Sequence, residues 1–225
     1  MASRKLVITM DGPAGAGKST VAKRLAEELG YLYLDTGAMY RAVALAAQRA
    51  GVSPEKEEDL CLLAEKAAIE LVPGKDGVRV FLNGEDVSEA IRTPEIDRLS
   101  SLVAKVAGVR RILVDKQRAL GARGGVVAEG RDMGSVVFPK ADVKFFLTAS
   151  PEVRARRRFE ELKKRGLDPD FPKVLAEIIE RDRQDQERPI APLVVPPGAI
   201  IIDTSNLEVE EVLRLVLAKV KEKLA

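Results

Sequence analysis

The stretch that decides the fold lies near the N-terminus and reads Gly12-Pro13-Ala14-Gly15-Ala16-Gly17-Lys18-Ser19-Thr20. Residues 12–19 match the pattern G-x-x-x-x-G-K-[ST], the Walker A sequence, in which a glycine-rich loop leads from a strand into a helix. The apolar run at residues 6–10 precedes the loop, and Val21, Leu25 and Leu29 follow it at helical spacing. Strand, loop and amphipathic helix therefore come in the order that the pattern requires.

This loop has the chemistry of a nucleoside triphosphate site. Its glycines let successive backbone N–H groups turn toward one point, where they can bind phosphate oxygens. In this pattern Lys18 reaches the β- and γ-phosphates, and the hydroxyl of Ser19 is a ligand of Mg²⁺. The helix that begins near Lys18 adds the positive end of its dipole. We therefore expect this loop to bind a nucleoside triphosphate with Mg²⁺.

Length and composition indicate one sizeable α/β domain. The chain has 225 residues, of which 46% are hydrophobic and 32% charged. The net charge of +2 gives no general electrostatic basis for binding nucleic acid. No apolar run has the length of a signal-peptide core or a membrane span. We expect a cytoplasmic protein with neither a nucleic acid nor a membrane as its partner.

Histidine is absent and Cys61 is the only cysteine. These counts exclude imidazole catalysis, an internal disulfide and the common zinc sites. Any chemistry must come from lysine, arginine, carboxylates, hydroxyls and a bound metal. Cys61 itself lies among leucines in a helical pattern, which predicts that it packs in the core.

Short runs rich in β-branched residues alternate with longer helical patterns, which is typical of a parallel sheet flanked by helices. The five predicted strands are residues 6–10, 31–34, 125–128, 143–147 and 199–203. Ligands bind at the carboxyl edge of such sheets. We therefore expect four polar residues that follow these strands to gather near the phosphate loop: Asp11, Asp35, Arg131 and Asp132.

The pattern changes to alternating apolar and polar residues between about 67 and 93. Two such runs, 69–72 and 78–82, flank a glycine-containing turn, and Asn83-Gly84 marks a second turn. This arrangement predicts an antiparallel hairpin within a small β insertion.

Two arginines stand where strands are predicted to end. Arg41 lies one turn into the helix that follows the second predicted strand and could hold a phosphate monoester through two parallel hydrogen bonds, although a surface pair with a carboxylate is an equal alternative. Arg131-Asp132 lies between glycines; such a pair is often a turn salt bridge, but its place at a strand end favours a functional role.

A third group, Arg181, Asp185 and Arg188, has the spacing of one helical face. From spacing alone, ion pairing along an exposed helix is the favoured explanation. The same explanation extends to three neighbouring pairs: Asp182 with Gln186, Arg156 with Glu160, and Arg157 with Glu161.

Five segments together resemble the bacterial cytidylate kinases, in order and along nearly the whole chain. They read D-G-P-A-G-A-G-K-S, L-D-T-G-A-M-Y-R, I-R-T-P-E-I, E-G-R-D-M-G-S-V-V-F-P and R-D-x-x-D-x-x-R-x-x-A-P-L. The resemblance implies transfer of the γ-phosphate of ATP to CMP or dCMP by a monomeric enzyme.

The resemblance also implies the fold of nucleoside monophosphate kinases. Residues 1–225 would form one P-loop kinase domain in three layers, with a five-stranded parallel sheet. An acceptor-binding region at about 36–100 would contain the β insertion, and a helical lid would span about 154–172.

Site residues follow from the same resemblance. ATP would be held by residues 12–20. The implied substrate-binding residues are Thr36, Arg41, Ser101, Arg110, Arg131, Asp132, Arg181, Asp185 and Arg188. Among them Arg41, Arg131 and Arg188 would bind the acceptor phosphate, whereas Arg181 and Asp185 would hold the ribose. Some members carry serine at Thr36, a change that keeps the hydroxyl.

The resemblance further implies catalytic roles for Lys18, Arg131, Arg188 and Arg158, and names Arg154, Arg157 and Arg158 as lid candidates. Base recognition would fall to Ser101, Arg110 and Asp132. An ionised Asp132 can accept from the cytosine amine while Arg110 donates to the ring. Uracil reverses two of these groups, so we expect a preference for CMP and dCMP over UMP. Two alternatives stay open: a P-loop kinase with another acceptor, such as shikimate, and a nucleotide-binding regulatory module.

Overall fold

The computed structural model describes residues 5–74 and 77–224. By its internal contacts the chain divides into two compact units, Met1–Leu32 with Gly124–Ala225 and Tyr33–Arg123. The predicted acceptor region, 36–100, falls within the second unit, and the predicted lid, 154–172, falls within the first. These boundaries, and the single domain of residues 1–225, stay predictions. Over the described residues, no helix offers an apolar length sufficient to cross a bilayer.

The main sheet has five parallel strands in the order β2-β6-β1-β7-β8. Their bounds are Val7–Asp11 for β1, Leu32–Asp35 for β2, Val126–Gly130 for β6, Val143–Thr148 for β7 and Ile200–Asp203 for β8. All five predicted strands are confirmed, with ends that differ by at most two residues. Several strands run past the last apolar residue because the backbone ladder continues into polar positions; Asp11, for example, still pairs with Gly130 and Phe146.

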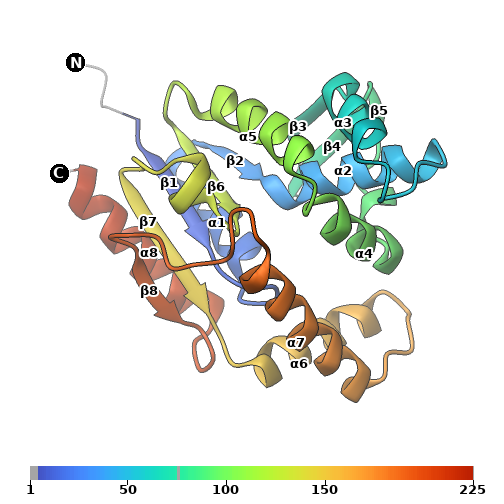
Figure 1. Cartoon of the computed structure of the whole chain (residues 1–225). Coiled ribbons are helices and arrows are strands. Elements are labelled where there is room, and N and C mark those ends of the chain that lie inside the picture. Colours follow the sequence, from blue (N-terminus) through green and yellow to red (C-terminus); the bar gives the residue numbers. More distant parts are fainter. Residues whose placement is uncertain (1–4, 75–76, 225) are drawn as a thin grey trace. The chain divides into compact units, whose positions relative to one another are not determined.

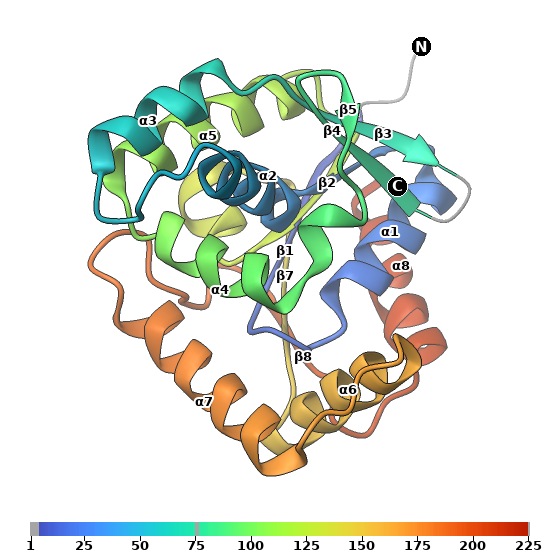
Figure 2. The same cartoon turned by 90° about the vertical axis from the view of Figure 1, so that its right-hand side faces the viewer.

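The first unit buries the centre of this sheet under helices. β1 and β6 are buried on both faces, as expected of parallel strands. Helices α1 (Lys18–Leu29) and α8 (Val209–Leu224) lie side by side and contact β6 and β7 respectively (Figures 1 and 2). Ile8, Met10 and Phe145 are fully buried in the resulting core. Because these strands are deeply buried, their register is fixed, and so is the position of the residues that follow each strand.

Three further elements complete the first unit. A single π-helical turn, η2, spans Met133–Val137, and two packed helices follow, α6 (Pro151–Lys164) and α7 (Phe171–Glu187). Both helices start at capping side chains, Ser150 and Asp170. They share a small apolar cluster formed by Ala155, Leu162, Val174 and Ile178. Because α6 and α7 have this core of their own, the residues on their other faces are held in fixed positions.

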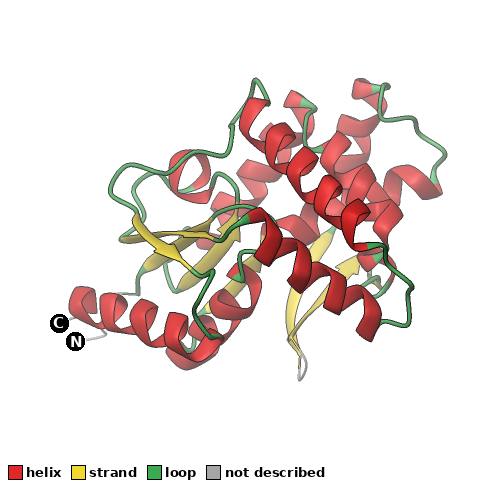
Figure 3. Ribbon diagram, turned by 90° about the horizontal axis from the view of Figure 1, so that it is seen from below, coloured by secondary structure: helices red, strands yellow, loops and turns green. Residues whose placement is uncertain are grey.

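The second unit contains the remaining helices and a small sheet. Its elements are α2 (Thr36–Arg49), α3 (Glu57–Lys66), β3 (Ile69–Gly74), β4 (Gly77–Leu82), β5 (Glu85–Asp86), the 3₁₀ turn η1 (Ala90–Arg92), α4 (Pro94–Val103) and α5 (Ala107–Gly121). The strands of this sheet and of the main sheet are yellow in Figure 3.

The predicted β insertion is confirmed as a separate antiparallel sheet in the order β3-β4-β5. At its second turn Asn83 and Gly84 both have positive φ, 52° and 84°. Two successive residues of this kind are what a type I′ hairpin turn requires, and asparagine followed by glycine supplies them at little cost. This sequence signal therefore predicted the turn correctly.

The prediction for Cys61 needs correction. Cys61 lies in α3 as expected, but its side chain is only partly buried, while Leu60 and Ala64 carry the buried face. Its sulfur packs against Gly108 of α5, where any side chain would overlap it. Leucines on several sides hid which face of the helix is turned inward, so spacing alone misplaced the cysteine.

Candidate active site

The phosphate loop connects β1 to α1 in a conformation that depends on its glycines. Gly12, Gly15 and Gly17 have φ of +143°, +76° and +88°, values that other residues rarely adopt. A side chain at Gly12 would also overlap the carbonyl oxygen of Leu147 in β7, and one at Gly15 would press on Arg154. The predicted glycine-rich turn is therefore confirmed, and two of its glycines are fixed by packing as well as by torsion.

Four successive carbonyl groups of this loop each accept a hydrogen bond from a side chain. The bonds run from Lys18 Nζ to Pro13 O (2.7 Å), from Arg154 to Ala14 O (3.2 Å), from Arg157 to Gly15 O (3.3 Å) and from Thr204 Oγ1 to Ala16 O (3.1 Å). In a planar trans peptide the N–H points opposite to the C=O. The N–H groups of residues 15–17 therefore each point away from the side chain that holds the preceding carbonyl. In the Walker A pattern such N–H groups bind phosphate oxygens.

Lys18, the one cation among residues 12–20, has a strongly lowered pKa. Its side chain is 5% exposed. Burial, followed by the nearby charge of Arg131, lowers the pKa of Lys18 from 10.5 to about 7, although Glu129, Asp185 and Asp11 oppose the shift. A buried amine of this kind gains from a polyanion that restores its charge. Ser19 and Thr20 occupy the exposed first turn of α1.

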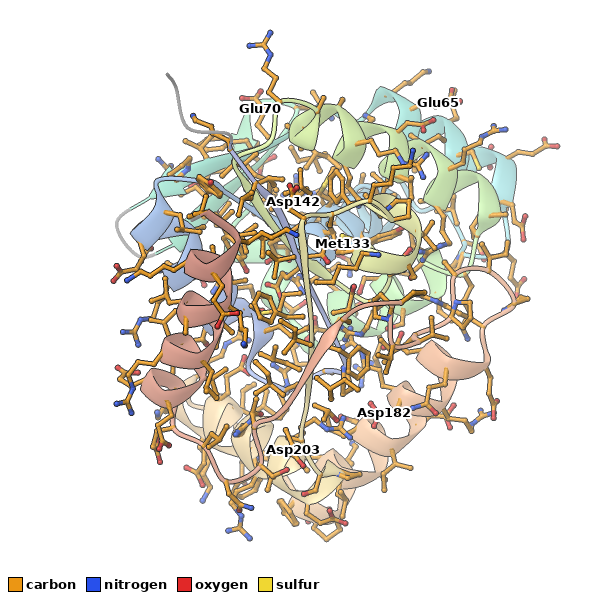
Figure 4. The ribbon with its side chains drawn as sticks, turned by 90° about the vertical axis from the view of Figure 1, so that its left-hand side faces the viewer. Glu65, Glu70, Met133, Asp142, Asp182 and Asp203 are labelled. Atoms are coloured by element: carbon orange, nitrogen blue, oxygen red, sulfur yellow. The ribbon has the colours of Figure 1, made fainter. Side chains whose placement is uncertain are left out.

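Asp11 fixes the segment that carries the Arg131-Asp132 pair. Its two carboxylate oxygens accept hydrogen bonds from the backbone N–H groups of Met133 and Gly134, both at 2.7 Å; Met133 is labelled in Figure 4. Burial raises the pKa of Asp11 to about 6, against the opposing effect of these two bonds. The sequence placed Asp11 near the loop, as the structure confirms, but gave no hint of this positioning role.

Arg131 pairs with Asp185 across 54 residues of sequence. Arg131 Nε donates to Asp185 Oδ2 at 2.7 Å, and the two side chains are 18% and 16% exposed. Burial alone would raise the pKa of Asp185, but Arg131, Arg181 and Arg188 together outweigh burial and hold that pKa below its ordinary value. The expectation of exposed ion pairs along the helix is therefore wrong for Asp185.

Arg188 and Asp132 form a second, more deeply buried pair. Their charged atoms lie 3.8 Å apart, and the side chains are 7% and 5% exposed. Arg188 Nε also donates to the Ala191 carbonyl at 2.6 Å. Helix α7 ends at Glu187, so Arg188 is its C-terminal capping residue and not a further position on one helical face. Pro189 cannot continue a helix, so it marks this end in the sequence, whereas the spacing of charged residues does not.

The lid candidates are engaged with protein groups. Arg154 is 3% exposed, forms a fork with Asp182 at 2.9 and 2.6 Å and donates to Ala149 O; Asp182 is labelled in Figure 4. Arg158 pairs with Glu161 at 2.8 Å. Both are thus held in place, Arg154 far more firmly than Arg158.

The predicted pairs among neighbours in this region are corrected by these contacts. Arg157 binds Gly15 and Thr204, not Glu161. Asp182 turns to Arg154 rather than to Gln186, and the Arg156 guanidinium lies 5.8 Å from the ring centre of Phe171. The i, i+4 rule fails where tertiary partners with buried oxygens compete.

In the second unit, the predicted residues occupy α2, α4 and α5. Asp35 caps α2 by accepting from Ala38 N at 2.8 Å and also pairs with Arg41 at 3.2 Å. Both charged side chains are less than a quarter exposed, 22% and 23%, so this is not a simple surface pair. The roles of Asp35 and Arg41 toward a phosphate stay predictions.

The base-reading candidates of this unit are also anchored. Arg110 is 3% exposed, donates to Ala104 O at 3.1 Å and lies 5.5 Å from the ring centre of Tyr40. Ser101 donates to Asp97 O at 3.2 Å, and Thr36 is buried in the first turn of α2. Arg110 therefore has a defined orientation, with the Tyr40 ring on one side of its guanidinium.

The comparison with protein families settles the relationship. The family model described as cytidylate kinase matches residues 8–222. The chain belongs to the cytidylate kinase family. It is 54% identical to the cytidylate kinase of Pelotomaculum thermopropionicum, covering 95% of each chain, and 49% identical to that of Bacillus subtilis (strain 168), covering 98% of each. The resemblance drawn from five motifs is thereby confirmed.

Solved structures confirm the fold. A shikimate kinase from Bacteroides thetaiotaomicron superimposes with a TM-score of 0.51 at 15% identity, covering 96% of this chain and 98% of that one. A gluconokinase from Sinorhizobium meliloti gives a TM-score of 0.50 at 16% identity. At such identities the likeness extends to the α/β architecture of small-molecule P-loop kinases and not to the choice of acceptor.

Proposed function

We propose that this member of the cytidylate kinase family transfers the γ-phosphoryl group of ATP to CMP or dCMP, giving CDP or dCDP and ADP. Two observations in the first unit carry the proposal. Side chains hold four successive carbonyls of the phosphate loop by hydrogen bonds. Two arginines, Arg131 and Arg188, are each held by a carboxylate. The full-length similarity to the two named cytidylate kinases supports the choice of acceptor.

ATP would bind to the N–H groups of residues 14–17, with Lys18 at the β- and γ-phosphates. Lys18 has three donor hydrogens, of which Pro13 O takes one. The remaining two are available for phosphate oxygens. Because burial and Arg131 disfavour its charge, the amine gains more from a triphosphate than an exposed lysine would.

The residues present fit a magnesium ion that arrives with the nucleotide. Among the described residues no cluster of three or more acidic, cysteine or histidine side chains could hold a metal. Mg²⁺ prefers oxygen ligands and keeps several waters, so one hydroxyl and the phosphates suffice. Ser19, exposed in the first turn of α1, is the proposed protein ligand. The ion would neutralise charge on the β- and γ-phosphates.

The acceptor phosphate would be held by Arg131, Arg188 and Arg41, the three arginines that the family resemblance implies. Phosphoryl transfer needs alignment and charge neutralisation more than covalent help from the protein. A phosphate monoester has its second pKa near 6 and is largely dianionic at neutral pH. A general base is therefore unnecessary, and Arg158 of the lid would add positive charge near the transferring group.

Asp132, Arg110 and Ser101 would read the base, Arg181 and Asp185 would hold the ribose, and Thr36 would supply a hydroxyl, as the family resemblance implies. An ionised Asp132 accepts from the cytosine amine but faces a carbonyl oxygen in uracil. A site built around such groups rejects the wrong partner by up to about 10⁴-fold, because a buried polar group is left unpaired. The monomeric state and the cytoplasmic location stay predictions from the sequence.

The test is ADP release from Mg-ATP by the purified protein, with CMP, dCMP, UMP, AMP, GMP and shikimate offered separately. Rapid turnover confined mainly to CMP and dCMP is the expected result. Turnover mainly with a different acceptor would be consistent with the fold but would contradict the proposed cytosine site. ATP binding with no acceptor-dependent ADP release would point to a regulatory module instead.

A further inference from the structure

Two residues that the proposed chemistry does not use meet behind the phosphate loop. Thr204 follows β8, directly after Asp203, which is labelled in Figure 4, and its side chain is almost fully buried. Arg157 lies in the second turn of α6 and donates to both oxygens of Thr204, to Oγ1 at 3.0 Å and to the carbonyl at 2.7 Å. The two residues therefore bind each other, and each also donates a hydrogen bond to a carbonyl of the loop.

The hydroxyl of Thr204 has one useful direction for its hydrogen. It lies 3.1 Å from both Ala16 O and Thr148 O. Thr148 O already accepts the backbone N–H of Thr204 at 2.7 Å, so Ala16 O is the acceptor that gains most from the hydroxyl. Arg157 supplies the hydrogen that the Oγ1 lone pair accepts. Hydrogen bonds therefore run in one direction, from Arg157 of α6 to the Thr204 hydroxyl and from that hydroxyl to the Ala16 carbonyl of the loop.

The geometry also separates Arg157 from a lid arginine that touches the nucleotide. Its Nη1 donates to Gly15 O and Thr204 Oγ1, and its Nη2 donates to the Thr204 carbonyl. These acceptors are backbone and hydroxyl oxygens, and the Gly15 carbonyl points away from the N–H group of Ala16 that follows it. A guanidinium in this position acts on phosphate through the loop.

We propose that Arg157 and Thr204 are a positioning pair, which holds the carbonyls of Gly15 and Ala16 so that the neighbouring N–H groups face the triphosphate. The inference rests on the proposed function only in taking ATP as the ligand of the loop. Loss of the pair loosens the loop, so it weakens ATP binding while the transfer step at saturating ATP is nearly kept. The acceptor arginines are on other elements, so CMP binding is unaffected.

The experiment measures binding of a non-hydrolysable Mg-ATP analogue by calorimetry, with kcat and both KM values alongside. Thr204→Val keeps the shape of the side chain and removes the hydroxyl, whereas Thr204→Ser keeps the hydroxyl and is the matched control. We expect the dissociation constant of the analogue to rise about tenfold in Thr204→Val, the effect of about one lost hydrogen bond, and less than about twofold in Thr204→Ser.

Arg157→Gln is the second variant in this experiment, and it tests the proposal by itself if Thr204→Val fails to fold. The expected result is again weaker analogue binding with kcat within about threefold, and a double variant less than additive, because the two residues share one contact. A fall in kcat of about 100-fold with unchanged analogue affinity would overturn the inference and make Arg157 a residue that touches the transferring phosphate. If no acceptor is phosphorylated by the wild-type protein, the proposed function fails, yet the analogue affinities still decide this inference.

Discussion

The phosphate loop and the acceptor arginines of the first unit both prepare a place for phosphate, but they do so by opposite means. In the loop the binding groups are backbone N–H groups, and the preceding carbonyls accept hydrogen bonds from Lys18 and from three side chains outside the loop, Arg154, Arg157 and Thr204. At the acceptor arginines, Arg131 and Arg188, the binding groups are side chains, and each is opposed by a carboxylate, Asp185 or Asp132. One site is prepared by conformation and the other by charge balance.

This difference predicts how each site responds to change. A backbone site has no selectivity of its own beyond charge and size, so damage to it should appear mainly in the affinity or reactivity of ATP. A site made of ion pairs is different, because a ligand that meets the arginines also meets the carboxylates. Damage there should appear in the choice of acceptor.

Removal of the amine at Lys18 should give the largest effect. We expect Lys18→Ala to lower turnover by at least about 10³-fold, because no other group of the loop carries a full positive charge to the γ-phosphate. Thermal unfolding should change little, since the pKa of Lys18, lowered to about 7, shows that burial disfavours its charge. Steady-state kinetics and a melting curve measure the two. Turnover within tenfold of wild type would show that the backbone N–H groups suffice alone.

Asp132→Asn tests the other half of the comparison. We expect kcat/KM for CMP to fall by about 10- to 100-fold and the preference for CMP over UMP to shrink by more than tenfold, because the amide can no longer act solely as an acceptor. Initial rates with both acceptors give the ratio. A loss of all turnover with intact folding, or an unchanged preference, would contradict a role in base recognition.

Asp11 connects the two sites, since it precedes Gly12 and holds the turn after Arg131. Its folded pKa of about 6 lies above the ordinary 3.8, so the folded state binds more protons between these values and the free energy of unfolding falls as pH rises from about 4 to 6. The shift corresponds to at most about 3 kcal/mol. Denaturant titrations of wild type and Asp11→Asn across this range should show a flatter profile in the variant; parallel profiles would be the contrary result.

Uptake of a fraction of a proton is the smallest expected effect. Phosphate oxygens favour the charged form of Lys18, so binding of Mg-ATP at pH 8 should raise the pKa of the amine and take up part of one proton. The uptake should be smaller at pH 6, where the amine is already charged. Calorimetry in two buffers of different ionisation enthalpy measures it. Lys18→Arg is the control, because a guanidinium stays charged throughout and should show no uptake at this position.

The fold was largely predictable because its signals are local. Short apolar runs rich in β-branched residues located all five strands of the main sheet, and Asn83-Gly84 located the turn of the small sheet. The errors lie where a choice among partners is decided in three dimensions. Asp185 and Asp182 each have neighbours of suitable charge or polarity in the sequence, yet both bind arginines from other elements. Spacing along a helix cannot weigh a buried partner against an exposed one.

The site was predictable in its residue types more than in its contacts. The Walker A pattern identified the loop, and the family resemblance identified the arginines. Neither indicated Asp11 as the anchor of η2 or Thr204 as a donor to the loop. A threonine after the last strand has no distinguishing signal, because its function depends on β8 lying beside β7 and on which carbonyl the hydroxyl meets.

The bond from Thr204 to Ala16 joins residues separated by 188 positions, and this separation has a consequence for the growing chain. The ribosome completes residues 12–20 first and residues 157 and 204 much later. A nascent chain shorter than 204 residues contains the entire Walker A sequence but lacks Thr204, one of the four side chains that donate to the carbonyls of the loop. Retention of nucleotide by chains of increasing length, released or ribosome-bound, would therefore report when the last strand has been added.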